Sequence, residues 1–292
     1  PDLRNPLEII DLSDIFVSSD FKPFRGAVVR GIKVDDIADK SNSWFNELVD
    51  YAKTIDMPGI GYITVMEDMS FKGPIDKFLT DEDRQKLISK ANLKKNSVLF
   101  FIADKNELIA SKQAGLIRTE LGRKLDLIDK NKFEFCIVND FPMFELNDEG
   151  KYDFGHNPFS MPQGGLEALN NSNIDEIKAY QYDFVCNGNE MASGAVRNHD
   201  INIMKKAFEI AGYSEETVKE RFKSLYTAFQ FGAPPHAGMA PGIDRIIMLL
   251  KDEPNLREVQ AFPTSVSGAD NMMGSPSELT EQQLREIHIK IR

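Results

Sequence analysis

Strand-like and helix-like patterns of apolar residues alternate over residues 27–125. Apolar residues on one face of a 3.6-residue period predict a helix, whereas short runs rich in β-branched and aromatic residues predict a strand. The expected elements are strands 27–34, 61–66 and 98–102, and helices 43–55, 80–91 and 106–125. Ser41 or Ser43 is expected to cap the first helix, and Thr80 with Asp83 resembles a capping box. Residues 7–16 read as a short helix or a strand edge.

This part of the chain predicts a compact α+β module of roughly 110 residues. It carries no concentrated set of histidines, cysteines or paired carboxylates, so we expect no catalysis there.

The pattern changes after Lys132 to longer strands rich in Phe, Val and Ile. Segments 179–187, 190–198 and 256–262 are expected to form antiparallel sheet, and helices are expected at 200–211, 215–230, 242–251 and 281–287. The fold class is therefore α+β.

A hairpin signal, Asn187-Gly188, joins two of these strands. A two-residue turn there would place the acids Asp183 and Glu190 on one face, with small neighbours that leave room for a ligand. Those neighbours are Val185, Ala192 and Gly194. Paired carboxylates beside open space suit a divalent metal held together with nucleotide phosphates. The alternative is two solvated acids on an exposed sheet face.

Arg197 has the wrong parity for that face. A β-bulge near Ser193-Gly194 would turn its side chain inward, because glycine often marks such bulges. The planar guanidinium could then grip a carboxylate through two hydrogen bonds.

Small residues at 238–242 precede a short amphipathic helix. Ile243, Ile246, Ile247 and Leu250 have the spacing of one buried stripe. Arg245 lies off that stripe in the first turn, where the helix dipole disfavours a cation. An arginine kept there suits an anion such as a nucleotide phosphate; the alternative is a solvated arginine, with Asp244 offsetting the dipole.

Composition adds limits on location and partners. The chain of 292 residues is 41% apolar and 28% charged, as in soluble globular proteins. Its longest apolar runs are too short to span a bilayer, and its first residues do not resemble a secretion signal. Cys136 and Cys186 are expected to be reduced core residues, so we expect a cytoplasmic protein that binds no membrane. The net charge of −11 disfavours a broad nucleic-acid-binding face but not a local patch.

Several motifs together carry a family resemblance. Gly238-x-Ala240-x-Gly242-x-Asp244-Arg245 resembles motif 3 of the class II aminoacyl-tRNA synthetases. Residues 257–263 and 272–277 resemble the C-terminal end of bacterial-type aspartate–tRNA ligases, and residues 1–6 resemble the stretch just after their motif 2. The likeness covers most of the chain.

The resemblance implies a partial class II antiparallel sheet flanked by helices, interrupted by an inserted α+β domain. Residues 1–13 would be a segment of the catalytic domain. Residues 14–132 would be an insertion domain similar to one shared with the B subunit of the glutamyl-tRNA amidotransferase. Residues 133–292 would be the C-terminal part of the catalytic domain, with motif 3.

The resemblance also assigns roles to single residues. Arg197 would hold the side-chain carboxylate of aspartate, and Asp183 and Glu190 would bind Mg²⁺, with Asp183 near the substrate amino group. His156, in the segment 152–160, matches the histidine of a mobile loop that closes over the amino acid. Asn157 stands where many family members have a second histidine, which leaves the role of that position open.

The nucleotide side follows from motif 3, while His236 is expected to be structural. The expected ATP-binding residues are Glu190, Gly242, Ile243, Asp244 and Arg245, of which Glu190 and Arg245 are also expected to be catalytic.

The implied activity is ATP- and Mg²⁺-dependent activation of aspartate, followed by transfer to tRNA. The implied partners are tRNA(Asp), with tRNA(Asn) as a second candidate, and a second copy in a homodimer. Motifs 1 and 2 and the anticodon-binding domain are not recognised, so the chain alone is expected to be an inactive piece of a synthetase. The alternatives are an asparagine–tRNA ligase and a non-catalytic tRNA-associated module, such as an amidotransferase subunit.

Overall fold

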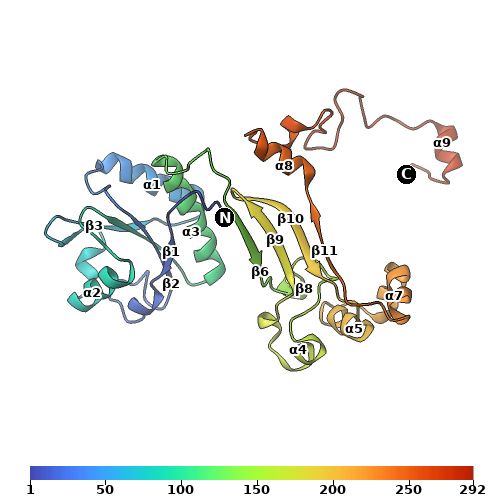
Figure 1. The fold of residues 1–292 in the computed structure, drawn as a ribbon, viewed down its shortest axis with the longest axis horizontal. Coiled ribbons are helices and arrows are strands. Elements are labelled where there is room, and N and C mark those ends of the chain that lie inside the picture. Colours follow the sequence, from blue (N-terminus) through green and yellow to red (C-terminus); the bar gives the residue numbers. More distant parts are fainter. Residues whose placement is uncertain (292) are drawn as a thin grey trace. The chain divides into compact units, whose positions relative to one another are not determined.

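The computed structural model describes residues 1–291, which form two compact units (Figure 1). The first unit is Leu3–Lys132, and the second combines Pro1–Asp2 with the residues from Phe133 onward. The expected boundary after residue 13 differs from this division. Strand β1 (Ile9–Asp11) pairs with β2 (Val28–Val34), with Ile9 opposite Ile32, so residues 3–13 belong to the first unit by their contacts.

The first unit is a five-stranded antiparallel sheet in the order β1-β2-β5-β3-β4. The expected strands and helices are confirmed to within two residues at each end. The largest difference is in the strand expected at 98–102, which continues to Asp104. The short helix η1 (Ser13–Ile15) lies between β1 and β2, and β2 is followed by α1 (Asn42–Thr54), β3 (Gly61–Val65), β4 (Phe71–Lys72), η2 (Asp76–Phe78), α2 (Asp81–Lys90), β5 (Val98–Asp104) and α3 (Glu107–Lys124).

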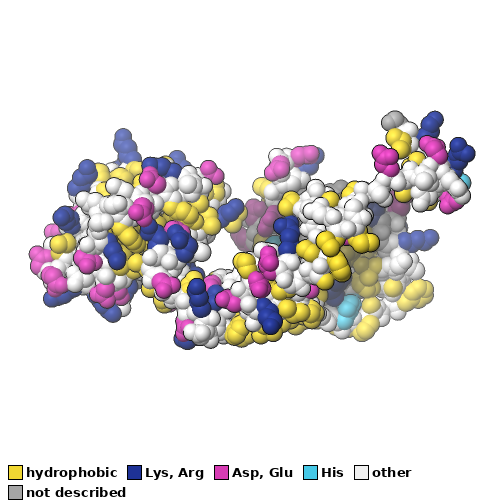
Figure 2. Space-filling model, turned by 90° about the horizontal axis from the view of Figure 1, so that it is seen from above, with side chains coloured by type: hydrophobic (Ala, Val, Ile, Leu, Met, Phe, Trp, Pro, Cys, Tyr) yellow, Lys and Arg dark blue, Asp and Glu magenta, His cyan; other side chains and the backbone are white. Residues whose placement is uncertain are grey.

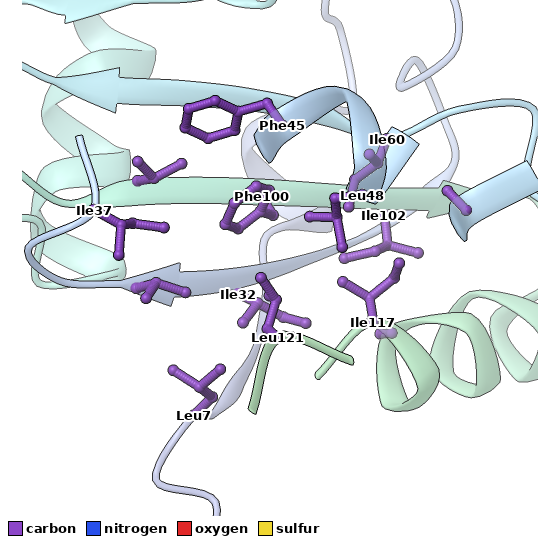
Figure 3. Packing of buried hydrophobic residues seen from close by; sticks show 14 of the residues in the cluster. Leu7, Ile32, Ile37, Phe45, Leu48, Ile60, Phe100, Ile102, Ile117 and Leu121 are labelled. Atoms are coloured by element: carbon purple, nitrogen blue, oxygen red, sulfur yellow. The ribbon is translucent and has the colours of Figure 1, made fainter. Parts of the chain in front are cut away.

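The central strand β5 is buried on both faces. Phe100 and its neighbours two residues away pack with α1 and α3, as Figure 3 shows, whereas Leu99 and Phe101 pack with η1 and α2. Each of these side chains is at most 1% exposed. The unbroken apolar run in this strand therefore reflects two separate cores.

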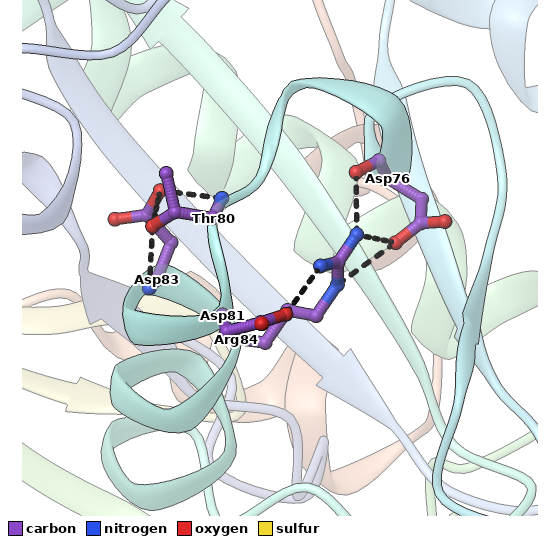
Figure 4. Close-up of polar contacts among 5 residues, drawn as sticks. All are labelled: Asp76, Thr80, Asp81, Asp83 and Arg84. Carbon is purple, nitrogen blue, oxygen red and sulfur yellow. Dashed lines mark hydrogen bonds and ion pairs between the residues drawn. The ribbon is translucent and has the colours of Figure 1, made fainter.

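Local polar contacts define the corner before α2 (Figure 4). The Thr80 hydroxyl accepts the Asp83 backbone N–H, and the Asp83 carboxylate accepts the Thr80 N–H, which confirms the expected capping box. Arg84 then bonds Asp76 at 2.9 Å and Asp81 at 3.0 Å, which ties α2 to η2.

The second unit contains a four-stranded antiparallel sheet, β11-β10-β9-β6, and a separate hairpin, β7–β8. The sheet strands are β6 (Phe135–Asn139), β9 (Gln181–Cys186), β10 (Asn189–Val196) and β11 (Ala237–Pro241), and the hairpin strands are β7 (Phe144–Leu146) and β8 (Tyr152–Phe154). The helices are α4 (Gly165–Asn171), η3 (Ile174–Glu176), α5 (Ile201–Ile210), α6 (Glu215–Arg221), α7 (Lys223–Gln230), α8 (Ile243–Leu250), η4 (Leu256–Val259) and α9 (Glu281–Glu286). The fold is α+β, as expected.

Three expectations for this unit were wrong. Residues 256–259 form the 3₁₀ helix η4 and not a strand, because the Asn255 side chain accepts the Arg257 N–H and caps a helical turn. Residues 237–241 pair with β10 as a strand, although no strand was expected there. The helix expected over 215–230 is divided at Phe222, which ends α6 and precedes α7.

Apolar side chains remain on the surface of the second unit, as Figure 2 shows from one side. The stripe expected to be buried on α8 is largely exposed: Ile243 is 61% and Leu250 67% accessible, and Met248 is the buried residue of this helix. Strand β11, just before α8, is exposed along its whole length. Nothing among residues 1–291 covers this stripe.

No helix among residues 1–291 is both long and apolar enough to cross a membrane.

Helices α5, α6 and α7 converge on one carboxylate, that of Glu215. It pairs with Lys219 at 2.8 Å and Lys205 at 2.9 Å, and it accepts a hydrogen bond from the Tyr226 hydroxyl at 2.7 Å. Led by the bond to Lys219, these donors lower the pKa of Glu215 from 4.5 to about 2.

Replacing Glu215 with Gln should therefore destabilise the helical part in a pH-dependent way. Because the folded-state pKa is the lower one, the contribution of Glu215 is complete above about pH 5 and is lost as the pH falls toward about 2. The unfolding midpoint of Glu215→Gln should lie below that of the unaltered chain near pH 7, and the two midpoints should converge only as the pH falls to about 2. Urea unfolding followed by circular dichroism measures this. The exposed neighbour Glu216, changed to Gln, is the control, and an equal effect from both variants would contradict the prediction.

Gly194 in β10 is required by the packing around it. A β-carbon there would lie 2.5 Å from the Gly238 carbonyl oxygen and 2.6 Å from the Tyr182 ring. Gly194→Ala should cost about 1–3 kcal/mol of unfolding free energy, as for other overpacked sites. Gly238→Ala is the matched control, because a β-carbon at Gly238 meets no atom within 4 Å. Equal denaturation midpoints for the two variants would show that β10 relaxes without cost.

Candidate functional site

A β-bulge at Met191 decides which residues of β10 face the candidate site. Glu190 pairs with Val185, but Ala192 pairs with Phe184, so Met191 is the extra residue. The expectation of a bulge in this strand is confirmed, but its expected position near Ser193-Gly194 was wrong. A bulge adds one residue to one strand, so the alternation of faces shifts by one beyond it.

The shift changes the expected set of neighbours. Ser193 lies opposite Asp183, and Ala195 lies opposite Gln181. These two residues, and not Ala192 and Gly194, therefore share the face of the two acids, since directly opposed residues point to the same side of a sheet. The Asn187-Gly188 turn is confirmed, with φ of 50° and 80° at its two residues.

The same shift brings Arg197 to this face, because it follows Ala195 by two residues. Its backbone N–H donates to the His236 carbonyl at 2.9 Å, and its guanidinium lies 5.5 Å from the centre of the Phe159 ring. Among residues 1–291 it pairs with no acid. The side chain is therefore held in place with its hydrogen-bonding edge available to an anion.

Arg245 in α8 contacts Glu190, which lies in β10. Its Nη1 donates to the Glu190 backbone carbonyl at 2.7 Å and lies 3.3 Å from the carboxylate. Both side chains are more than 40% exposed, so this ion pair by itself adds little stability. The contact places the motif 3 arginine beside the expected metal-binding acid.

Asp183 lies in the same electrostatic field. Burial raises the pKa of its carboxyl, and the charge of Glu190 raises it further, while His156 and Arg245 act in the opposite direction. A carboxylate held near a second one in a partly buried place is stabilised by a cation. The charges of Glu190, His156 and Arg245 thus all act on the Asp183 carboxyl.

The junction between β11 and α8 is fixed by the bulge. The Gly242 N–H donates to the Met191 carbonyl at 2.7 Å, and Gly242 then caps α8 with ordinary negative φ. A β-carbon at Gly242 would meet the surrounding protein atoms at normal distances of 3.6 Å or more. No crowding within the chain explains the glycine, which leaves close approach of a ligand as its expected role. Asp244 accepts a hydrogen bond from Gln260 at 2.9 Å, and Ile243 is exposed.

Two adjacent hollows occupy this side of the sheet. One, of about 430 Å³, is lined by Arg197, His236, Gln181, Asn157 and the small residues of β10 and β11. The other, of about 460 Å³, is lined by Glu190, Arg245 and Gly242 with residues nearby in the chain. Ala240 lines both. One hollow thus contains an unpaired arginine and the other contains the motif 3 residues.

His236, and not His156, lines the first hollow. His156 is exposed, packs edge-on against Phe141 at 4.8 Å between ring centres, and lies outside the lining of the first hollow. His236, expected to be structural, lines that hollow while its Nδ1 lies 2.8 Å from the Pro234 carbonyl. The Gln181 side chain in the lining was missed, because only strand pairing brings it beside Arg197.

Two acidic side chains of the candidate site could bind a divalent metal ion. No group of three or more His, Cys, Asp or Glu side chains suited to a metal occurs among residues 1–291. Asp183 and Glu190 supply two carboxylates. That number fits Mg²⁺, which commonly takes one or two carboxylates together with waters and phosphate oxygens.

The chain is similar in sequence to known proteins. A family model described as tRNA synthetases class II (D, K and N) matches residues 1–266. The aspartate–tRNA ligase of Streptomyces coelicolor is 48% identical over 100% of this chain and 50% of its own length. The aspartate–tRNA(Asp/Asn) ligase of Ehrlichia ruminantium (strain Gardel) is 53% identical with the same coverage. A solved aspartyl tRNA synthetase from Entamoeba histolytica aligns at 18% identity and a TM-score of 0.37, over 82% of this chain and 44% of its own.

The chain thus spans about half the length of the relatives that it matches. The family match covers both hollows and all the residues that line them. This chain belongs to the class II tRNA synthetases of the D, K and N group.

Proposed function

We propose that this chain forms the aspartate- and ATP-binding part of an aspartate–tRNA ligase. The observation that carries the proposal is the unpaired Arg197 guanidinium in a hollow without carboxylates, next to a second hollow that holds Arg245 and Glu190. The first hollow suits an amino acid with an acidic side chain, and the second suits the phosphates of ATP. The relatives, which are aspartate–tRNA ligases by name, support the same assignment.

In the proposed reaction the α-carboxylate oxygen of aspartate attacks the α-phosphorus of ATP, and the bond to pyrophosphate breaks. The aspartyl group then passes to the tRNA 3′ end. Arg197 would bind the side-chain carboxylate and so orient the α-carboxylate for attack. His156 would close over the amino acid, and Asp183 would lie near its amino group. Catalysis of the first step needs mainly positioning and neutralisation of phosphate charge.

Arg245 would neutralise charge on the nucleotide phosphates. The phosphate oxygens would compete with the Glu190 carboxylate for the Arg245 guanidinium, since the ion pair between Arg245 and Glu190 is exposed and weak. Glu190 and Asp183 would hold Mg²⁺, whose positive charge would help to offset that of the nucleotide phosphates. Gly242 would let the phosphates approach the start of α8, beside Ile243 and Asp244.

The first unit is proposed to be an insertion domain without a catalytic role, with the remainder forming the catalytic domain. Its sheet has its own two cores and none of the residues assigned to the reaction. The full-length enzyme here means a protein of the relatives' length that contains this chain. Replacing its residues 14–132 with a flexible linker should keep the rate of adenylate formation within about tenfold of the original. Loss of adenylation in a folded variant would show that the unit takes part.

The remaining partners follow from the same assignment. The full-length enzyme would bind tRNA(Asp), with tRNA(Asn) as a second candidate because some relatives are named for both. It would work in the cytoplasm as a homodimer, and the exposed stripe of α8 would be covered by the rest of the catalytic fold. The chain alone would then be inactive.

Arg197→Lys should raise the KM for aspartate at least about tenfold and leave the KM for ATP nearly unchanged. A charge-assisted pair is worth about 1.5–3 kcal/mol, and lysine cannot reproduce the two parallel hydrogen bonds. Aspartate-dependent exchange of pyrophosphate into ATP by the full-length enzyme measures both constants. The control is Arg221→Lys, at an exposed arginine of α6. An unaltered aspartate dependence would falsify the role of Arg197.

Glu190→Gln and Asp183→Asn should each weaken ATP use in a way that added Mg²⁺ partly restores. Loss of one carboxylate lowers the affinity for the metal but leaves the other ligand in place. The measurement is the Mg²⁺ concentration that gives half-maximal exchange, which should rise several-fold in both variants. The same Mg²⁺ dependence in the unaltered enzyme and in both variants would exclude the pair as metal ligands.

A further inference from the structure

The Gln181 carboxamide lies beside Arg197 in the first hollow. Gln181 opposes Ala195 across β9 and β10, and Arg197 follows Ala195 by two residues, so all three side chains point to the same side of the sheet. Gln181 and Arg197 both line the hollow of about 430 Å³. Both side chains therefore border the space in which the substrate carboxylate is expected to bind.

Its orientation is set by the segment that carries His156. Gln181 Oε1 lies 3.4 Å from the Asn157 backbone nitrogen and 3.4 Å from the Ser160 hydroxyl. A backbone N–H can only donate, so the amide oxygen and not the NH₂ group must face this segment. Ser160 is fully buried, and its own N–H donates to the Asn157 carbonyl at 3.1 Å. The two groups that donate to Gln181 Oε1 are therefore fixed in place.

The NH₂ group of Gln181 is the part that remains for a ligand. Within residues 1–291 it donates to no protein atom. Asn157, in the same lining, is arranged alike: its Oδ1 accepts the Phe159 N–H at 2.9 Å, which leaves its Nδ2 as the available group. Main-chain donors thus occupy the oxygens of both amides, and both amides have hydrogen-bond donors left over.

The hollow therefore offers donors and few strong acceptors. Its lining includes the guanidinium of Arg197 and no Asp or Glu. A carboxylate accepts hydrogen bonds at both oxygens, whereas a carboxamide of the same shape brings an NH₂ group that would face other donors and stay unpaired. An unpaired buried donor is costly, so this arrangement discriminates between the two.

On the basis of the proposed function, we propose that Gln181 is a specificity-determining residue: its Nε2–H donates to the side-chain carboxylate of the substrate beside Arg197 and favours aspartate over asparagine.

The deciding variant is Gln181→Glu in the full-length enzyme. Glutamate keeps an oxygen for the bonds from Asn157 and Ser160 but replaces the NH₂ donor with a second acceptor. In amino-acid-dependent pyrophosphate exchange, the KM for aspartate should rise at least about tenfold, since a donor is lost and a like charge is added. The preference for aspartate over asparagine in kcat/KM should fall at least about tenfold, with the KM for ATP within about twofold of the original.

Two further variants separate donation from support of the His156 segment. Ser160→Ala removes one bond to Gln181 but keeps its NH₂ group, and should retain the aspartate preference. Gln230→Glu adds the same charge on an exposed residue of α7 and controls for net charge. If Gln181 only anchors the segment, the uncharged variant Gln181→Met will raise the KM values for aspartate and for asparagine by similar factors and keep the preference for aspartate, and that result overturns the proposal.

Thermal unfolding of each variant accompanies the kinetics. If Gln181→Glu does not fold, Gln181→Met takes its place. It has similar size and no donor, and it should lower the aspartate preference several-fold; an unchanged preference in Gln181→Met would also overturn the proposal. Absence of aspartate-dependent exchange in the unaltered full-length enzyme would instead refute the proposed function itself, and this inference with it.

Discussion

The candidate site depends on one extra residue in β10. Without Met191 as a bulge, the alternation of the strand would turn Arg197 away from Asp183 and Glu190. The same residue also accepts the N–H of Gly242 through its carbonyl, and so fixes where α8 begins. A single local irregularity therefore sets both the amino-acid side and the nucleotide side of the site.

Charge is distributed unevenly around this bulge. Arg197 stands without an acid among residues 1–291, whereas Arg245 contacts Glu190 and lies in the field of Asp183. An unpaired arginine can bind an anion without first losing a partner, while a paired one exchanges one anion for another. This difference suits a hollow that selects a carboxylate and a neighbouring hollow that handles phosphates.

The first unit relies on a different physical principle. Its central strand is buried on both faces, and α1 and α3 cover one face while α2 covers the other. Two cores of this kind make the unit self-sufficient in apolar packing. The second unit leaves the stripe on α8 exposed and holds the polar site. The candidate site thus lies in the second unit, whose own buried apolar clusters pack around α5.

Local signals in the sequence determined the elements whose causes are local. Thr80 capped its helix and Asn187-Gly188 made its turn, because hydrogen bonds and backbone preferences within a few residues decide both. The placement of Asp183 and Glu190 on one face of the hairpin followed from that turn. Only the tertiary structure decided the position of the bulge, the exposure of α8 and the place of Gln181. These depend on which strand lies alongside which, and a shift of one residue reverses every face of a strand. Patterns along a single strand cannot encode that choice, because it is made by the pairing between strands.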